Sequence, residues 1–336
     1  MHLSKTILAL SLGVAQAFAQ TAAQPLKPLT QAPATSGKAA PAVASSTSPA
    51  TSAQPAPIAD TAIHVRGSDL LQTAIGEPLT RYAQQAHLAM DVDMRGSIAA
   101  LSGLKSGTVQ LAIVDAPPGT LPAPKEYTAI PLCFAADYVI VNAENPLNAL
   151  DMGQIAAVFG STKRSATIWG DLRAPADWAA RPIFACTTST DDGVALEMFK
   201  NEALGTSELL PTIRIMPTAH DLIKVVADTP AAIGVCAYDP GPPNKVLLLA
   251  KLPDSSSISA PVPNAARPTA ENLLSGDYPL RLPFYIVFRP EDKTRVLPLI
   301  RLLLGDEYAA HLTAEHFIPV PDTIRNRSLL ELDNSR

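Results

Sequence analysis

From Ala62 onward, short apolar runs alternate with longer stretches in which apolar residues recur at helical spacing. The first of these units predicts a strand over Ala62–Arg66, then a turn. A helix follows, with Leu71, Ile75 and Leu79 on one face. Such alternation is typical of βα units that build a mainly parallel sheet flanked by helices. The predicted fold class is therefore α/β.

The second unit predicts a strand over Ala89–Met94, a turn, a short helix, and a further strand over Val109–Val114. Ser68, Ser97 and Asp115 each follow the end of a predicted strand. The carboxyl ends of parallel strands meet at one edge, where the following helices present free N–H groups to ligands. We therefore expect these three polar residues to converge.

A long apolar strand over Ile130–Val141 is predicted to lead into a second region. Its expected elements are helix Asp151–Phe159, strand Pro182–Cys186, helices Asp192–Leu204 and Asp221–Ala227, strands Ala232–Tyr238 and Lys245–Ala250, a strand-like run Tyr278–Phe288, and a last helix from about Asp292 to Leu304.

The beginning of the chain has the layout of a secretory signal. Lys5 precedes an apolar run over Ile7–Phe18, and the small-x-small triplet ends at Ala19, after which cleavage is expected. The alternative is a membrane anchor, but a span needs about 20 apolar residues and this run is shorter. Residues 20–60 are nearly all Ala, Pro, Ser, Thr and Gln, which predicts a disordered linker.

Charge and composition exclude several function classes. The chain has 26 Lys and Arg against 31 Asp and Glu, and no basic block interleaved with aromatics, so nucleic acid is not expected as a partner. Cys133, Cys186 and Cys236 lie in apolar runs and are expected as buried thiols, with a Cys186–Cys236 bridge as the alternative. No metal spacing, nucleophile elbow or phosphate loop is present, so we expect no cofactor.

A series of segments along the folded part points to a known family. They are Val65–Asp69, Gly96–Leu101, Ala112–Pro117, Asn145-Pro146, Ala232–Gly234, Pro268–Asn272 and Gly276–Leu280. In this order they resemble the phosphate-type solute-binding proteins of bacterial ABC importers, which have the type II periplasmic binding fold. The resemblance implies two lobes joined by two crossing strands, with 61–140 plus 280–325 in the first lobe and 141–279 in the second. Residues 326–336 are expected as a C-terminal tail. Binding in the cleft closes the lobes by a hinge.

The resemblance also assigns roles in the first lobe. Asp115 matches an aspartate that accepts a hydrogen bond from a protonated phosphate oxygen and so repels fully deprotonated anions. A capping role is the alternative. Ser97 matches a serine that donates to phosphate, and Ser68 and Asp69 lie in the other anion-binding loop. Arg95 precedes a Gly-Ser turn and is a candidate cation, with a solvated arginine as the alternative.

The second lobe departs from the family pattern, in which an Arg is followed, after three residues, by Ser-Gly-Thr. This pattern aligns with Thr188 to Val194, and Thr188 replaces the Arg. The change removes a bidentate cation. The ligand-binding candidates on this side are Thr188, Ser189, Thr190 and Gly193, of which only Gly193 is kept from the pattern.

We therefore expect an exported, monomeric periplasmic protein that captures a small oxyanion, first of all phosphate, and delivers it to an ABC permease without chemistry. The alternative is a diverged member that serves as an envelope sensor or protein-interaction module. A third possibility, an enzyme, has only the hydroxyl and carboxylate cluster at Thr187–Asp192 in its favour, with no activating base.

Overall fold

A computed structural model describes residues 62–162, 165–189, 195–205, 208–251, 262 and 264–334. The chain divides into two units, 1–58 and 59–336, and every element below belongs to the second. The expected signal sequence (1–19) and linker (20–60) lie outside the described residues.

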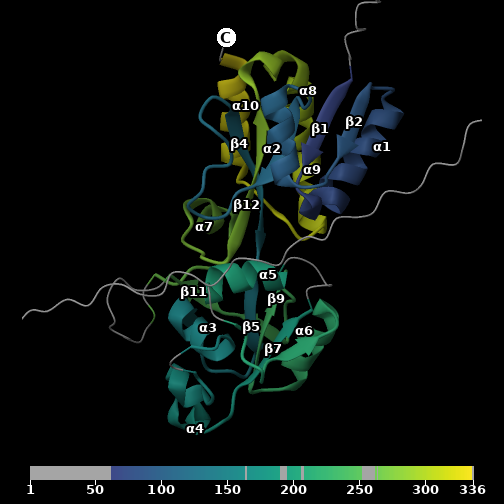
Figure 1. Cartoon of the computed structure of the whole chain (residues 1–336). Coiled ribbons are helices and arrows are strands. Elements are labelled where there is room, and N and C mark those ends of the chain that lie inside the picture. Colours follow the sequence, from purple (N-terminus) through teal and green to yellow (C-terminus); the bar gives the residue numbers. More distant parts are fainter. Residues whose placement is uncertain are drawn as a thin grey trace, which may run out of the picture. The chain divides into compact units, whose positions relative to one another are not determined.

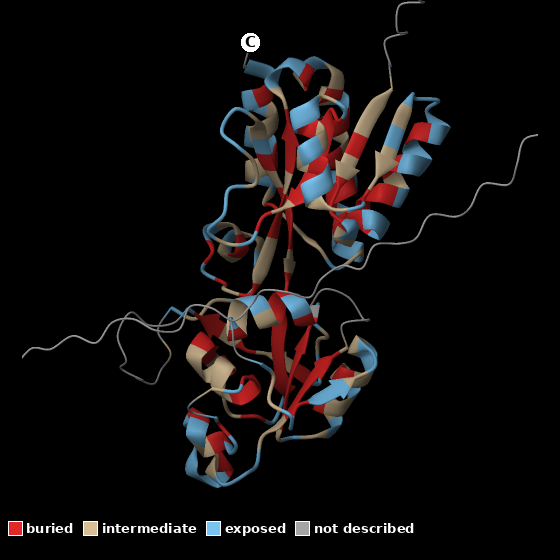
Figure 2. Ribbon diagram, viewed as in Figure 1, coloured by how far each residue is buried: buried red, intermediate tan, exposed pale blue. Residues whose placement is uncertain are grey.

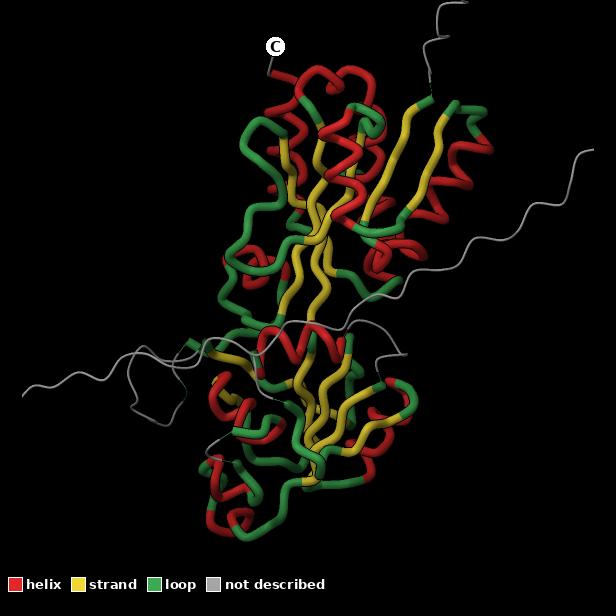
Figure 3. The backbone as a smooth tube through the Cα atoms, in the orientation of Figure 1, coloured by secondary structure: helices red, strands yellow, loops and turns green. Residues whose placement is uncertain are grey.

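One sheet has six strands and is mixed: its pairings are parallel at β1 and antiparallel at β12 and β13 (Figures 1 and 3). Its order is β13 (Ile318–Pro319), β4 (Thr128–Ala136), β12 (Arg281–Phe288), β3 (Leu111–Asp115), β1 (Ile63–Gly67) and β2 (Met90–Asp93). Strand β1 pairs parallel with both β2 and β3, whereas β12 runs antiparallel to β3 and β4. The carboxyl ends of β1, β2 and β3 therefore share one edge.

A second sheet has five strands, in the order β10 (Asn244–Val246), β5 (Tyr138–Asn142), β9 (Ala232–Cys236), β7 (Phe184–Thr188) and β8 (Arg214–Met216). A small parallel ladder joins β11 (Leu248–Ala250) to β6 (Ala149–Asp151). The predicted α/β class, with sheets flanked by helices, is confirmed.

The single strand predicted over Ile130–Val141 is wrong. The run is divided at Asp137 into β4, which pairs with β12 and β13, and β5, which pairs with β9 and β10. Apolar residues continue on both sides of Asp137 because both strands are buried, so the hydrophobic periodicity does not show that the strand partners change there.

Two sets of helices cover the two sheets (Figure 1). With the six-stranded sheet belong α1 (Glu77–Gln85), α2 (Ser97–Ser106), α8 (Lys293–Leu303), α9 (Asp306–Ala314) and α10 (Asp322–Asn334). The others are α3 (Met152–Phe159), α4 (Ala176–Ala179), α5 (Ala195–Phe199), α6 (Ala219–Asp228) and α7 (Ala270–Ser275). Short 3-10 turns span Asp69–Leu71, Trp169–Leu172 and Pro290–Asp292, and π-helical turns span Gln72–Gly76 and Lys200–Leu204.

Residues 326–334 form the greater part of α10 and not the expected tail. Leu332 on this helix is 5% exposed and belongs to the core beneath the six-stranded sheet. Arg325 donates to the carbonyl of Leu304 at 3.1 Å, which fixes the start of α10 against α8. Because most residues around Leu332 are polar, the sequence does not predict this packing.

Successive side chains of β3 belong to two apolar clusters, one on each face of the six-stranded sheet. Leu111 and Ile113 pack with α1, α8 and α9, whereas Ala112 and Val114 face α2. Figure 2 shows the buried strands between more exposed helices.

The second core surrounds the five-stranded sheet and contains both tryptophans. Trp169 and Trp178 are buried, and their rings pack edge to face with centroids 6.4 Å apart. Cys133, Cys186 and Cys236 are buried and free, so the alternative of a Cys186–Cys236 bridge is not realised.

Helix α3 illustrates how local sequence sets an element boundary. Asp151 accepts from the N–H of Gln154 at 2.8 Å, and the Gln154 side chain accepts from the N–H of Asp151 at 2.9 Å. This capping box satisfies two N–H groups that the helix itself leaves unpaired. Among the described residues, every helix is too short or too polar to cross a membrane.

Candidate functional site

The turn after β1 brings two strand ends together. The N–H of Gly96 donates to the carbonyl of Gly67 at 2.8 Å, and the N–H of Ser68 donates to Ile113 at 2.8 Å. A Cβ at Gly67 would lie 2.6 Å from the Ile113 oxygen and 2.6 Å from the Met94 sulfur. Only glycine fits this approach, so Gly67 holds the β1, β2 and β3 ends in register.

Ser97 and Asp115 are brought into direct contact at this edge. The Ser97 hydroxyl donates to Oδ1 of Asp115 and accepts from the backbone N–H of Asp115 at 3.1 Å. Ser97 is the first residue of α2, and Asp115 is the last residue of β3. The predicted convergence of these two residues, which lie 18 positions apart, is therefore present.

The N-terminus of α2 is open to a ligand. Its N-cap is Gly96, which has φ of +124° and offers no side chain to accept from the first N–H groups of the helix. No acidic residue lies in the first turn. Free N–H groups and the positive end of the helix dipole therefore lie beside the Asp115 carboxylate.

Ser68 lies on the same edge and is 1% exposed. Its hydroxyl has no hydrogen-bond partner within the described residues, which makes it an available donor. Asp69 starts the 3-10 turn that follows and is exposed, and Leu70 is half-buried. Ser68 is therefore the stronger of the two ligand candidates in this loop.

The two arginines near this edge are engaged with carboxylates. Arg95 donates through Nε to both oxygens of Asp93, at 2.7 and 2.6 Å, and its side chain is 84% exposed. The bonds to Asp93 raise the pKa of Arg95. Arg66 donates to the Asp91 side chain and to the carbonyl of Val65, so its guanidinium is held along the sheet.

The candidates of the second region belong to the five-stranded sheet. Thr188 ends β7 and is 2% exposed, and the N–H of Ser189 donates to Met216 at 3.0 Å. Thr190 and Gly193 lie outside the described residues. Thr188 and Ser189 thus occupy the end of a strand, the position at which parallel sheets hold ligands.

Asp137 is a candidate functional residue that was not predicted from the sequence. This residue joins β4 to β5, is fully buried, and has no hydrogen-bond partner for either carboxylate oxygen among the described residues. The available signal was a single charged residue inside the apolar run Ile130–Val141.

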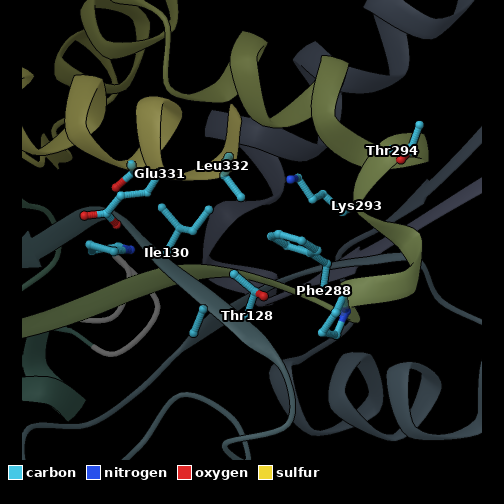
Figure 4. Close-up of a pocket in the computed structure, with 11 residues that line it drawn as sticks. Thr128, Ile130, Phe288, Lys293, Thr294, Glu331 and Leu332 are labelled. Carbon is cyan, nitrogen blue, oxygen red and sulfur yellow. The ribbon is translucent and has the colours of Figure 1, made fainter. Parts of the chain in front are cut away.

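A pocket of about 630 Å³ lies at the opposite end of the six-stranded sheet (Figure 4). Thr128 and Ile130 line it from β4, Phe288 from β12, and Lys293 and Glu331 from the helices. A second pocket, of about 650 Å³, is lined by His64, Gln110 and Arg289 among others. Along β12, Phe288 is four residues from Phe284, the partner of Asp115, or roughly 13 Å at strand spacing. Neither pocket belongs to the Ser97–Asp115 edge.

The sequence matches the family described as the PBP superfamily domain over residues 40–310, and the chain belongs to that family. Together with the edge at Ser97 and Asp115, this membership places the protein among the periplasmic-binding-protein folds.

Relatives agree with this class. The phosphate-binding protein PstS of Pseudomonas aeruginosa is 25% identical over 215 residues, which cover 61% of this chain and 64% of that protein. A possible phosphate binding protein from Planctomyces limnophilus superimposes with a TM-score of 0.62 at 17% identity, covering 81% of this chain and 98% of that one. An ABC-type phosphate transport receptor from Vibrio cholerae superimposes with a TM-score of 0.55 at 18% identity, covering 76% of this chain and 99% of that one. These likenesses confirm the two-lobed fold.

Proposed function

We propose that this protein is a solute-binding receptor that captures a small oxyanion, phosphate in the first place. The observation that carries the proposal is the contact between Ser97 and Asp115 at the uncapped N-terminus of α2. N–H groups at a helix start bind oxyanions, and a neighbouring carboxylate accepts only from an oxyanion that still has a proton.

Two kinds of neutral donor lie on this edge. Ser68 contributes a buried hydroxyl that has no partner among the described residues, and the first turn of α2 contributes backbone N–H groups. Arg95 remains a candidate cation whose charge is shared with Asp93. A site built from dipoles beside Asp115 favours a singly charged, protonated oxyanion over a fully ionised one such as sulfate.

The second half of the proposed site comes from the end of β7, with Thr188 and Ser189. Thr190 and Gly193, which lie outside the described residues, belong to the proposal on the sequence alone. The name of the Pseudomonas aeruginosa relative, phosphate-binding protein, supports the ligand. The chain spans about 64% of that relative's length. Delivery to an ABC permease, a periplasmic location, a monomeric state and the absence of catalysis belong to the proposal.

The experiment is a calorimetric titration of the purified, ligand-free protein with inorganic phosphate, with sulfate as the matched control. We expect a dissociation constant in the micromolar range or tighter, about −8 kcal/mol or better, and no heat with sulfate. A folded protein that gives no heat at millimolar phosphate would refute phosphate as the ligand and favour an interaction module on the same fold.

A further inference from the structure

The chain leaves the six-stranded sheet through one residue, Asp137, whose side chain is fully buried. An ionised carboxylate in such a place, without a partner, is too costly for a folded protein, so the group holds a proton instead. Burial raises the pKa of Asp137 well above its ordinary range.

The chain returns to the six-stranded sheet through a second segment, and two hydrogen bonds join that segment to the backbone of Asp137. Its N–H donates to the carbonyl of Leu280 at 3.2 Å, and its carbonyl accepts from the hydroxyl of Tyr278 at 2.6 Å. Tyr278 is itself fully buried. The two segments that connect the six-stranded and five-stranded sheets are thus bonded to each other at Asp137. A rotation of one sheet against the other has to change what surrounds this side chain.

Among the described residues, Asp137 acts electrostatically on two groups, Cys236 on β9 and Tyr278, and Tyr138 on β5 follows it in the chain. Burial raises the pKa of Tyr138 to about 12 and that of Cys236 to about 12, so both are neutral at physiological pH. The carboxylate of Asp239 also acts on Tyr138 and Cys236 and adds negative charge to the surroundings.

The positively charged side chain at the start of β12 bonds to another group. Arg281, the first residue of β12, donates through Nη1 to the carbonyl of Leu273 at 2.5 Å. No cationic side chain among the described residues forms an ion pair with Asp137, and burial is the cause of its shifted pKa. In this arrangement, therefore, only a proton can neutralise the carboxylate.

We propose that Asp137 is a proton-dependent element of the hinge: the arrangement seen here requires the carboxyl to be protonated, and an arrangement that brings the carboxyl to water or to a donor releases the proton. The step breaks the carboxyl O–H bond and passes one proton to solvent. Lower pH favours the present arrangement, and higher pH favours the other. That solute binding uses this hinge rests on the proposed function, whereas the protonation does not.

The protonation is tested by infrared spectroscopy of the full chain at about pH 7, comparing wild type with Asp137→Asn. The matched control is Asp239→Asn, which removes an exposed carboxylate near the same side chains. We expect a C=O band of a protonated carboxylic acid in wild type and in the control but not in Asp137→Asn. A wild-type spectrum without that band would overturn the proposal.

Stability gives a second measurement. The unfolded carboxyl has a pKa of about 3.9, so above it only the folded state holds this proton, and stability falls as pH rises towards the raised pKa. We expect the equilibrium constant for folding of wild type to fall about tenfold per pH unit relative to that of Asp137→Asn. The constant of Asp239→Asn should follow that of wild type. Parallel pH profiles for wild type and Asp137→Asn would contradict the proposal.

The link to the hinge is tested by small-angle X-ray scattering without any solute, at about pH 5 and about pH 8. We expect the radius of gyration of wild type to change with pH and that of Asp137→Asn to stay constant. A wild-type radius that does not change, or one that changes equally in the variant, would overturn the link. Because no phosphate is added, this result is independent of whether phosphate is the solute.

Discussion

Replacing Ser97 by alanine removes the hydroxyl that joins α2 to the end of β3. In the native protein that hydroxyl donates to Oδ1 of Asp115 and accepts from the N–H of the same residue at 3.1 Å. Without it, the Asp115 carboxylate is free to turn, and one donor at the N-terminus of α2 is lost. The substitution leaves the helix itself intact because alanine is a good helix former.

The size of the effect follows from the type of hydrogen bond. A hydrogen bond to a charged group contributes about 1.5–3 kcal/mol, and that to the backbone N–H about 1 kcal/mol. Ser97 is half-buried, so water replaces part of the loss in the free protein. Once phosphate has displaced that water, we expect the affinity of Ser97→Ala to fall by about 10- to 100-fold, or about 1.4–2.7 kcal/mol.

Isothermal titration with phosphate measures the change directly, and thermal unfolding shows that the variant is folded. The matched control is Ser102→Ala, the same substitution at an exposed position of the same helix. We expect its phosphate affinity to equal that of wild type within error.

Wild-type affinity in a folded Ser97→Ala variant would refute the assignment of this edge as the anion site. An equal loss in Ser102→Ala would show that the effect comes from the helix and not from the hydroxyl.

Three further substitutions test other parts of the site. Asp115→Asn replaces an acceptor by an amide that can donate to an ionised oxyanion, so the ratio of phosphate to sulfate affinity should fall by about tenfold in competition titrations; an unchanged ratio would refute the discriminating role of Asp115. Arg95→Ala should weaken phosphate binding by less than about fivefold, because the guanidinium is 84% exposed and paired with Asp93; a larger loss would make it the main cation of the site. Gly67→Ala places a Cβ 2.6 Å from the Ile113 oxygen and should lower the free energy of unfolding by about 1–3 kcal/mol, measured by urea denaturation; a variant as stable as wild type would contradict the tight turn.

Local patterns predicted much of this fold because they depend on neighbouring residues. The helical spacing after Ser68 and the strand predicted over Val109–Val114 correspond to elements of the structure, and the observed strand β3 spans Leu111–Asp115. The placement of Ser97 and Asp115 on one edge also followed from the sequence, since residues at or just after the carboxyl ends of parallel strands must meet there. The family resemblance, read from ordered segments, is confirmed by the match over residues 40–310.

Side-chain partners could not be predicted in the same way. Arg66 and Arg95 look equivalent in sequence, each before a Gly-Ser turn, yet Arg66 is held along the sheet by Asp91 and Arg95 projects to solvent beside Asp93. Which carboxylate an arginine reaches depends on strand order, and strand order is a property of the whole chain.

The sequence by itself thus determined the α/β class, the family, and the strand ends that carry Ser68, Ser97 and Asp115. Only the tertiary structure decided that the apolar run Ile130–Val141 divides between two sheets and that Asp137 lies fully buried at the division. The physical reason is that hydrophobic periodicity reports how deeply a strand is buried, whereas the identity of its hydrogen-bonded neighbours depends on residues far along the chain.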